Sequence, residues 1–149
     1  MVKTLLKEVK EYKKNTLLSP VYVSIEAILE VLNPFLMAIL VDNGIEKGDM
    51  KSIWFYGFLM LVAAFVSLWA GAKSGKHAAI ASSGFAKNLR KAEYRKIQEF
   101  SFSNVDAYST SGLITRMMTD VTNIQNAYQM MIRVCVRAPL MLIASLVMA

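Results

Sequence analysis

Two carboxylates, Glu26 and Glu30, stand one helical turn apart inside a long apolar run, and Asn33 follows one turn later. Carboxylates at this spacing can attract a cation from a transport cavity, or they can pair with a helix that is missing from this chain. If the run crosses a bilayer, the charges are costly unless one of these two conditions holds. The sequence therefore predicts a candidate substrate cavity or a structural ion pair at Glu26, Glu30 and Asn33, and it favours neither interpretation.

No other group of residues indicates catalysis. The segment GAKSGKH resembles a phosphate-binding loop, but it has three residues between its glycines instead of four. It also lacks the hydroxyl residue after Lys76 and follows an apolar run instead of a strand. His77 has no metal-binding or catalytic neighbour in the sequence, and the single Cys135 cannot form an internal disulfide. We expect no catalytic residue, no cofactor-binding residue and no metal site.

The elements that position these residues are long apolar helices. Of the 149 residues, 55% are hydrophobic, and the run 53–72 contains no charged residue. Because about 20 apolar residues cross a bilayer core of about 30 Å, the runs 17–40 and 53–72 are both long enough to span it. A third run, 134–149, is cut off by the end of the chain. The first run is too long and too far from the N-terminus for a signal peptide, and no small-residue cleavage site follows it.

The distribution of basic residues predicts the topology. Lys residues precede the first run, Lys and Arg residues follow the second, and the connecting loop VDNGIEKGDMK is nearly balanced in charge. Since Lys and Arg accumulate on the cytoplasmic side of membrane proteins, we expect a cytoplasmic N-terminus and a cytoplasmic middle segment. The net charge of +6 is thereby explained by topology, and it does not indicate nucleic-acid binding.

Helical periodicity extends two of these runs beyond the membrane. Residues 3–14 place Leu5, Val9 and Tyr12 on one face among lysines, which predicts a short amphipathic helix on the inner leaflet, with a disordered basic tail as the alternative. After the second run no proline occurs until Pro139, so a single helix is expected over 53–100. At 1.5 Å per residue such a helix is about 70 Å long, and more than half of it would project into the cytoplasm.

Small residues recur at every fourth position of this long helix. The row runs from Ala63 to Ser83, and it includes the four candidate packing residues Ser67, Gly71, Gly75 and Ala79. Small residues at this spacing let helix backbones approach closely, so the row predicts the face on which the neighbouring helix packs.

A polar segment, SFSNVDAYSTSGLITRMMTDV, separates the second helix from the third. Hydroxyl residues at 109–111 are candidate N-caps, and an apolar stripe from Leu113 to Cys135 then leads into the third run. The third helix is therefore expected over 110–149, and the polar segment is expected at the tip of a cytoplasmic helical hairpin. Arg133 and Arg137 are expected to lie at the cytoplasmic edge and to reach toward lipid phosphates.

Three segments resemble the N-terminal part of the transmembrane domain of ABC exporters: PFLMAILVDNGI, FAKNLRKAEYRKIQEFSFSNVD and TSGLITRMMTDVTNIQNAYQMMIRVCVRAPL. The last is the most specific, because the family has a TG-x-L-x-x-R-x-x-x-D-like pattern after its first coupling helix. Leu113, Arg116 and Asp120 are in register with that pattern, whereas Thr110 and Ser111 together precede Gly112. The SLITR-like and VRAP-like segments resemble the bacterial heterodimeric multidrug-type branch most closely.

The resemblance implies an all-α membrane protein with an elbow helix at 3–14, spans at 17–40, 53–100 and 110–149, and a coupling helix at 103–108. The coupling helix would consist of Ser103, Asn104, Val105, Asp106, Ala107 and Tyr108. It would sit in a groove of a nucleotide-binding domain, which would hold ATP and magnesium outside this chain. The implied partners are the lipid bilayer, that domain and a second subunit of a heterodimer, but no nucleic acid.

The implied activity is ATP-driven export of small amphipathic or drug-like molecules across the inner membrane by a multi-pass protein. Two other functions remain open from the residues alone. One is the membrane anchor of a sensor kinase, although such proteins usually carry a large outside domain and need no third span. The other is a small structural membrane protein that lacks any ATP-driven motor.

Overall fold

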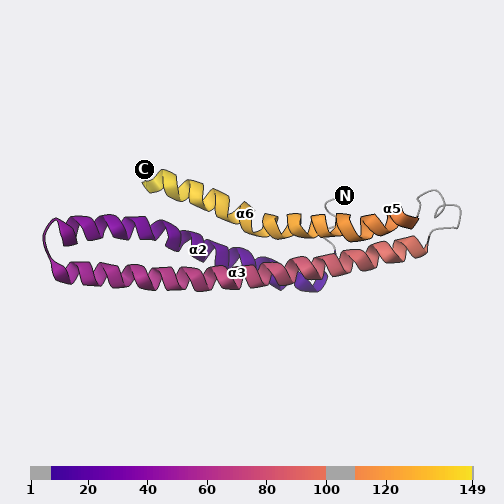
Figure 1. Ribbon diagram of the computed structural model, residues 1–149, viewed down its shortest axis with the longest axis horizontal. Helices are drawn as coiled ribbons and strands as arrows, with labels where there is room; N and C mark the ends of the chain where they lie inside the picture. The colour runs from indigo at the N-terminus through magenta and orange to yellow at the C-terminus, as the bar shows by residue number, and fades with distance from the viewer. Residues whose placement is uncertain (1–7, 100–109, 149) are drawn as a thin grey trace.

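A computed structural model describes residues 8–99 and 110–148. The described residues form long helices that lie side by side (Figure 1). Their elements are the 3-10 turn η1 (Lys10–Tyr12), helix α2 (Lys13–Leu40), the π-helical turn η2 (Val41–Ile45), helix α3 (Met50–Gln98), helix α5 (Thr110–Thr115), the π-helical turn η3 (Arg116–Asp120) and helix α6 (Val121–Met148). Helices α2 and α3 form an antiparallel hairpin, and α6 returns along α3 from its far end.

Three helical stretches in the described part of the chain are long and apolar enough to cross a membrane: Lys13–Ile45, Met50–Gln98 and Met117–Val147. The expected number and order of apolar helices is thus confirmed, with α2 beginning slightly before the expected 17–40. Many of their large apolar side chains are exposed, and Trp54 and Phe65 are 76% and 69% exposed. Side chains of this kind face lipid in a membrane helix, since no water-driven collapse is needed there.

Helix α3 is a single helix of 49 residues, as its sequence predicts. Its first turn is capped by Asp49, whose carboxylate accepts hydrogen bonds from the Lys51 backbone N–H at 3.1 Å and from Ser52 Oγ at 2.7 Å. These hydrogen bonds lower the pKa of Asp49 below its ordinary value, that from Ser52 more strongly. Just before it, Gly48 has φ +65°, a left-handed conformation that suits glycine and lets the chain turn back.

The buried core lies where three segments meet: the chain before α2, the second half of α3, and α6. Its members are Val9, Ala81, Phe85, Ala86, Leu89, Val121, Tyr128 and Ile132. The rings of Phe85 and Tyr128 stack with their centroids 4.6 Å apart. Tyr12 lies flat against Gly84, where an added Cβ would overlap its ring. Thr16 Oγ1 and the Tyr128 hydroxyl hydrogen-bond at 3.0 Å, which ties α2 to α6.

The expected elbow helix is only partly within the described residues, which begin at Glu8. In this part, Lys10–Tyr12 form one 3-10 turn, and residues 13–14 already belong to α2. Val9 is buried in the core, and Tyr12 packs against it. The apolar side chains of the predicted amphipathic face therefore contact protein at these two positions.

The packing face of α3 differs from the expected row by one residue. Buried small residues occur at the four shifted positions Ala70, Ser74, Ala78 and Ser82, whereas Ala63 of the expected row is also buried. Ser19 Oγ of α2 donates to the Ser74 carbonyl at 3.2 Å, so this face does contact the neighbouring helix. Gly71 and Ser67 are half-buried, but Ala79 is exposed, and an added Cβ on Gly75 would meet no atom within 4 Å. Small residues therefore occupy every fourth position in two adjacent registers, and the hydrogen-bonded contact with α2 lies on the register that contains Ser74.

Candidate functional site

Glu26 and Glu30 of α2 converge on one residue of α6. The Arg137 guanidinium donates from Nη2 to Glu30 Oε1 and Oε2 at 2.7 and 2.8 Å. Its Nη1 lies 3.4 Å from Glu26 Oε1. The planar guanidinium therefore bridges two carboxylates: Nη2 donates to both oxygens of Glu30, and Nη1 donates to Glu26. The three side chains join α2 to α6 inside the apolar part of the helices.

Glu26 also depends on α3, because its carboxylate lies against Gly71. A Cβ added to Gly71 would stand 3.0 Å from Glu26 Oε1 and 3.1 Å from its Cδ. The side chain of Glu26 is 14% exposed, and its Oε2 is buried with no hydrogen-bond partner in the described residues. The absence of a side chain at Gly71 therefore leaves the space that the Glu26 carboxylate occupies. A predicted packing residue, Gly71, thus contacts a predicted cavity residue, Glu26.

These contacts change two of the predictions. Arg137 does not reach away from the protein toward lipid phosphates, because it is paired with both carboxylates. The structural interpretation of Glu26 and Glu30 is thereby favoured over a cation-attracting wall, and their partner belongs to this chain. Asn33 is half-buried one turn beyond, and its Oδ1 has no hydrogen-bond partner in the described residues. Sequence reasoning missed Arg137 as the partner, although an arginine within an apolar run was an available signal.

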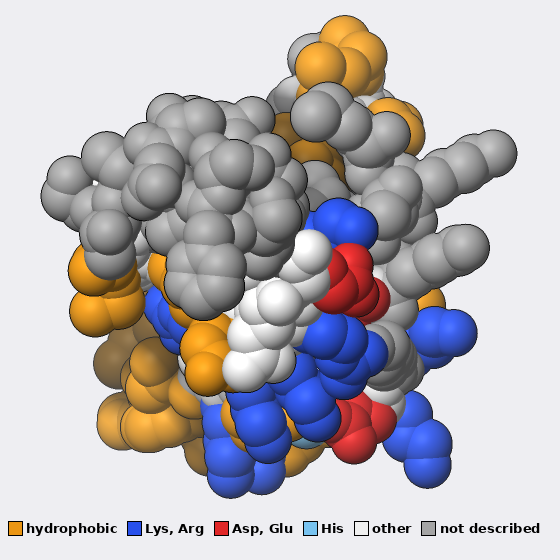
Figure 2. Space-filling view, turned by 90° about the vertical axis from the view of Figure 1, so that its right-hand side faces the viewer, with side chains coloured by type: hydrophobic (Ala, Val, Ile, Leu, Met, Phe, Trp, Pro, Cys, Tyr) orange, Lys and Arg blue, Asp and Glu red, His pale blue; other side chains and the backbone are white. Residues whose placement is uncertain are grey.

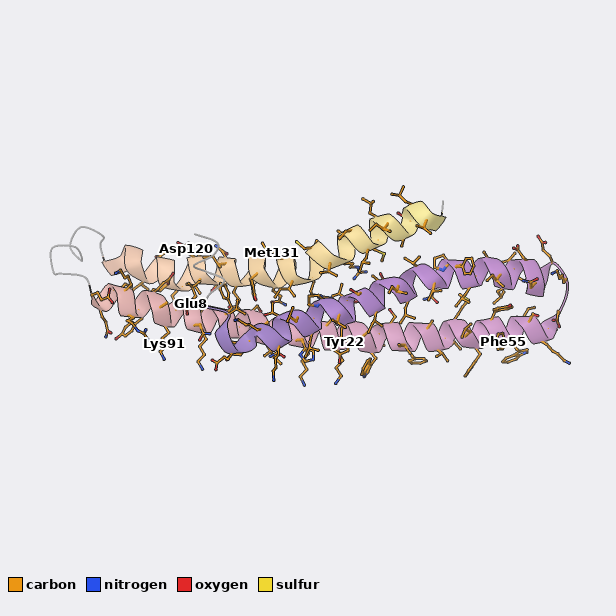
Figure 3. The ribbon with its side chains drawn as sticks, turned by 180° about the vertical axis from the view of Figure 1, so that it is seen from behind. Glu8, Tyr22, Phe55, Lys91, Asp120 and Met131 are labelled. Carbon is orange, nitrogen blue, oxygen red and sulfur yellow. The ribbon has the colours of Figure 1, made fainter. Side chains whose placement is uncertain are left out.

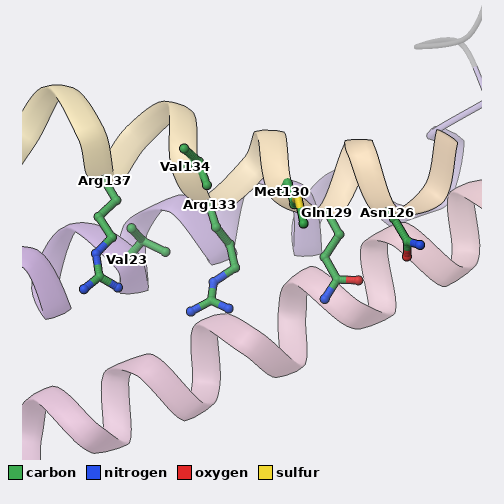
Figure 4. A pocket seen from close by; sticks show the side chains of 7 residues that line it. All are labelled: Val23, Asn126, Gln129, Met130, Arg133, Val134 and Arg137. Atoms are coloured by element: carbon green, nitrogen blue, oxygen red, sulfur yellow. The ribbon is translucent and has the colours of Figure 1, made fainter. Parts of the chain in front are cut away.

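A groove of about 500 Å³ adjoins this ion-pair cluster. Val23 of α2 lines one wall, and the rest of the lining comes from α6: Asn126, Gln129, Met130, Arg133, Val134 and Arg137. Figure 4 shows Gln129 and Arg133 extending from α6 toward α3. Gln129 Oε1 accepts a hydrogen bond from Ser82 of α3 at 3.2 Å. The groove thus has a polar side formed by amides and guanidinium groups and an apolar side formed by Val23, Met130 and Val134.

The second half of α3 and the first half of α6 form a hairpin with polar contacts along its length. Arg90 Nη2 donates to Thr122 Oγ1 at 3.4 Å, and Gln125 Nε2 donates to Ser83 Oγ at 3.4 Å. Burial, and then the Asp120 carboxylate, raise the pKa of Glu93 above its ordinary value. Figure 3 shows Lys91 and Asp120 in this half of the molecule, with Phe55 toward the opposite end.

The end of this hairpin is strongly basic. Figure 2 looks onto that end, and Lys and Arg side chains gather on it. The predicted coupling segment, Ser103 to Tyr108, lies outside the described residues, as does the tip around it. The side chain of Arg116, which is in register with the family pattern, is also outside the described side chains.

The remaining candidate residues have structural contacts. His77 Nδ1 and Asn15 Oδ1 hydrogen-bond at 2.9 Å, and the His77 ring stacks on Tyr22 with centroids 5.6 Å apart. The segment GAKSGKH lies inside α3, so its backbone amides are used by the helix and cannot cradle a phosphate. In the described part of the chain, no group of three or more His, Cys, Asp or Glu residues could hold a metal ion.

The described residues thus form long apolar helices with an ion-pair cluster between α2 and α6. The family described as ABC transporter transmembrane region matches residues 16–149. The chain belongs to this family, which confirms the all-α ABC transporter fold that the sequence motifs predict.

Two of three similar curated proteins are named as ABC transporter proteins, and the third is named as a flippase. The chain is 37% identical over 124 residues to the uncharacterized ABC transporter ATP-binding protein YfiB of Bacillus subtilis, covering 83% of this chain and 22% of that protein. It is 27% identical over 157 residues to an uncharacterized ABC transporter ATP-binding protein of Mycobacterium tuberculosis, covering 100% of this chain and 26% of that protein. It is 26% identical over 140 residues to an ATP-dependent lipid A-core flippase of Albidiferax ferrireducens, covering 94% and 24%. The chain thus spans about a quarter of the length of these relatives.

Proposed function

We propose that this chain is the membrane-spanning and coupling part of an ATP-driven exporter of small amphipathic molecules. The observation that carries the proposal is the match of residues 16–149 to the ABC transporter transmembrane region. The extension of α3 supports it, because only about 20 of its residues are needed to cross the bilayer. The remainder is paired with α6, and a nucleotide-binding domain would contact the predicted coupling segment 103–108 between these two helices.

Several finer points belong to the same proposal. ATP and magnesium would bind to a nucleotide-binding domain outside these 149 residues, and the relatives named as ATP-binding proteins support this division. The protein would lie in the inner membrane, with its N-terminus and the hairpin tip in the cytoplasm. The basic residues at the end of the hairpin support this orientation, because Lys and Arg accumulate on the cytoplasmic side of membrane proteins. The second subunit would complete a heterodimer, as the SLITR-like and VRAP-like segments suggest. The groove beside α6, with one polar and one apolar side, suits an amphipathic substrate.

Substitutions in the predicted coupling segment test the proposal. In the complete transporter, Val105→Asp and Tyr108→Ala each remove apolar contact from the surface that would face the nucleotide-binding domain. We expect both variants to fold and to bind substrate, but to lose the stimulation of ATP hydrolysis by substrate. Met118→Ala is a matched control, since Met118 is 64% exposed on the same hairpin. Normal stimulation and transport in both coupling variants would show that residues 103–108 form an ordinary solvated turn.

A further inference from the structure

Arg133 is the charged residue of the groove whose side chain has no charged partner among the described residues. It lies on α6 one turn before Arg137, and it is half-buried. Its Nε is buried and has no hydrogen-bond partner in the described part of the chain. A buried donor on a permanently charged group is costly when it stays unpaired, and in membrane helices such residues mark substrate pathways. Arg133 therefore needs an acceptor from outside the described residues.

The neighbours of Arg133 indicate what kind of acceptor fits. Asn126 and Gln129 add amide groups to the same groove, whereas Met130, Val134 and Val23 line it with apolar surface. The volume of about 500 Å³ lies within the range of small-molecule sites. Among the described residues that line the groove, the charged ones are Arg133 and Arg137, and Arg137 is bonded to Glu26 and Glu30, which are not part of the lining. That ion-pair cluster keeps one net negative charge, so the charge that faces the groove itself is the Arg133 guanidinium. An anionic group can pair with Arg133 there, whereas a cationic group cannot.

We propose that the groove binds the anionic head group, a phosphate or a carboxylate, of a transported amphipathic molecule, with Arg133 as its charge partner. This inference rests on the proposed export function and specifies the substrate class. Arg133 donates to the head-group oxygens, Asn126 and Gln129 add amide hydrogen bonds, and the apolar tail lies against Met130, Val134 and Val23. The planar guanidinium can donate two parallel hydrogen bonds to such a group, which the ammonium of Lys cannot do.

Three probes that share one tail test this assignment. Dodecyl phosphate, dodecyl glucoside and dodecyltrimethylammonium differ only in having an anionic, neutral or cationic head. The complete transporter is placed in nanodiscs of digalactosyldiacylglycerol, a lipid without phosphate. Apparent affinity is taken from the concentration dependence of thermal stabilisation, because a ligand that binds the folded state stabilises it. ATP hydrolysis is measured separately. We expect dodecyl phosphate to bind the wild type most tightly.

The variants then assign this preference to one side chain. Arg133→Gln should weaken the binding of dodecyl phosphate by roughly 10- to 100-fold, the loss typical of a hydrogen-bonded charge, and should leave dodecyl glucoside unchanged. Arg133→Lys should restore part of the affinity. Lys87→Gln removes the same charge from an exposed position of α3 and should have no effect on either probe.

The outcomes separate the two proposals. Equal affinity of the wild type for the three head groups would overturn the inference. This comparison uses no variant, so its result does not depend on whether a variant folds. A preference for dodecyl phosphate that persists in Arg133→Gln would also overturn the inference. So would poor subunit assembly of Arg133→Gln that Arg133→Lys restores, because Arg133 would then pair with a carboxylate of the partner subunit. Arg133-dependent binding without stimulated ATP hydrolysis would support the site and would contradict the export function.

Discussion

Replacing Arg137 by methionine should destabilise the membrane helices more than any other single substitution in the ion-pair cluster. Methionine has nearly the length of arginine and no charge, so the change removes the guanidinium without creating a large cavity. It leaves Glu26 and Glu30 without their shared partner, and the Glu30 carboxylate loses contacts of 2.7 and 2.8 Å. The variant therefore isolates two carboxylates within the apolar part of α2.

The magnitude follows from the exposure of the three side chains. Removing one partner from a fully buried pair costs about 3–5 kcal/mol, because the remaining charge stays uncompensated. Here Arg137, Glu30 and Glu26 are 40%, 34% and 14% exposed, so the pair with Glu30 deserves a discount for its open side. We expect a loss of about 2–3 kcal/mol in the free energy of unfolding. More of it should come from Glu30, whose contacts are 2.7 and 2.8 Å, than from Glu26, whose contact is 3.4 Å.

A double-mutant cycle measures this coupling. Arg137→Met, Glu30→Gln and the double variant are prepared in the complete transporter, and unfolding of the membrane helices is followed in detergent. The double variant should be more stable than the sum of the two single losses predicts, since it no longer contains an unpaired Glu30 carboxylate. Glu26→Gln should show weaker coupling to Arg137, because their contact is 3.4 Å. Losses that simply add would refute the ion-pair reasoning.

Three further predictions concern other parts of the molecule. Cysteines at positions Asn43 and Asn104, with the single native cysteine removed, should react with impermeant reagents from opposite sides of the membrane; labelling of both from outside would contradict the topology. Gly84→Ala should lower thermal stability, because its Cβ would overlap an aromatic ring, whereas Gly75→Ala should be tolerated; equal effects would contradict the packing. Because the pKa of Glu93 is raised in the folded state, its charge opposes folding above that pKa. Glu93→Gln should therefore have a higher melting temperature than the wild type at neutral pH, and this difference should shrink as the pH falls toward the ordinary glutamate pKa of 4.5. A difference that stays constant with pH would show that the titration of Glu93 is not its source.

The helices could be predicted from the sequence because each depends on residues close together in the chain. Length and polarity alone locate α2 and α3, and the absence of proline from Pro34 to Pro139 allows α3 to continue beyond the bilayer. The hairpin of α3 and α6 follows from the same local signals. Family membership was also predictable, since the motif around Gly112 is specific.

Contacts between helices were harder to predict, because they depend on how each helix is rotated about its axis and how far it is shifted along that axis relative to its neighbour. Small residues occupy both Gly75 and Ser74, and only the position of α2 decides which one is buried. Arg137 lies 107 residues from Glu30 in the chain, so no periodicity links them. The sequence shows an arginine and two carboxylates in apolar runs, but it does not show that they stand at the same height.

The position of the buried core has a mechanical consequence. Phe85 marks the place where α3 is held by α6 and by the chain before α2. At 1.5 Å per residue, α3 extends about 20 Å from Phe85 to Gln98 and about 52 Å from Phe85 to Met50. A rigid tilt of α3 about this fulcrum that shifts Gln98 by about 2 Å would displace Met50 by roughly 5 Å, since both arms follow the same helix rise. With α3 tilting as a rigid body about Phe85, the unequal arms would make the helix a lever that enlarges a small movement at its Gln98 end into a larger one at its Met50 end.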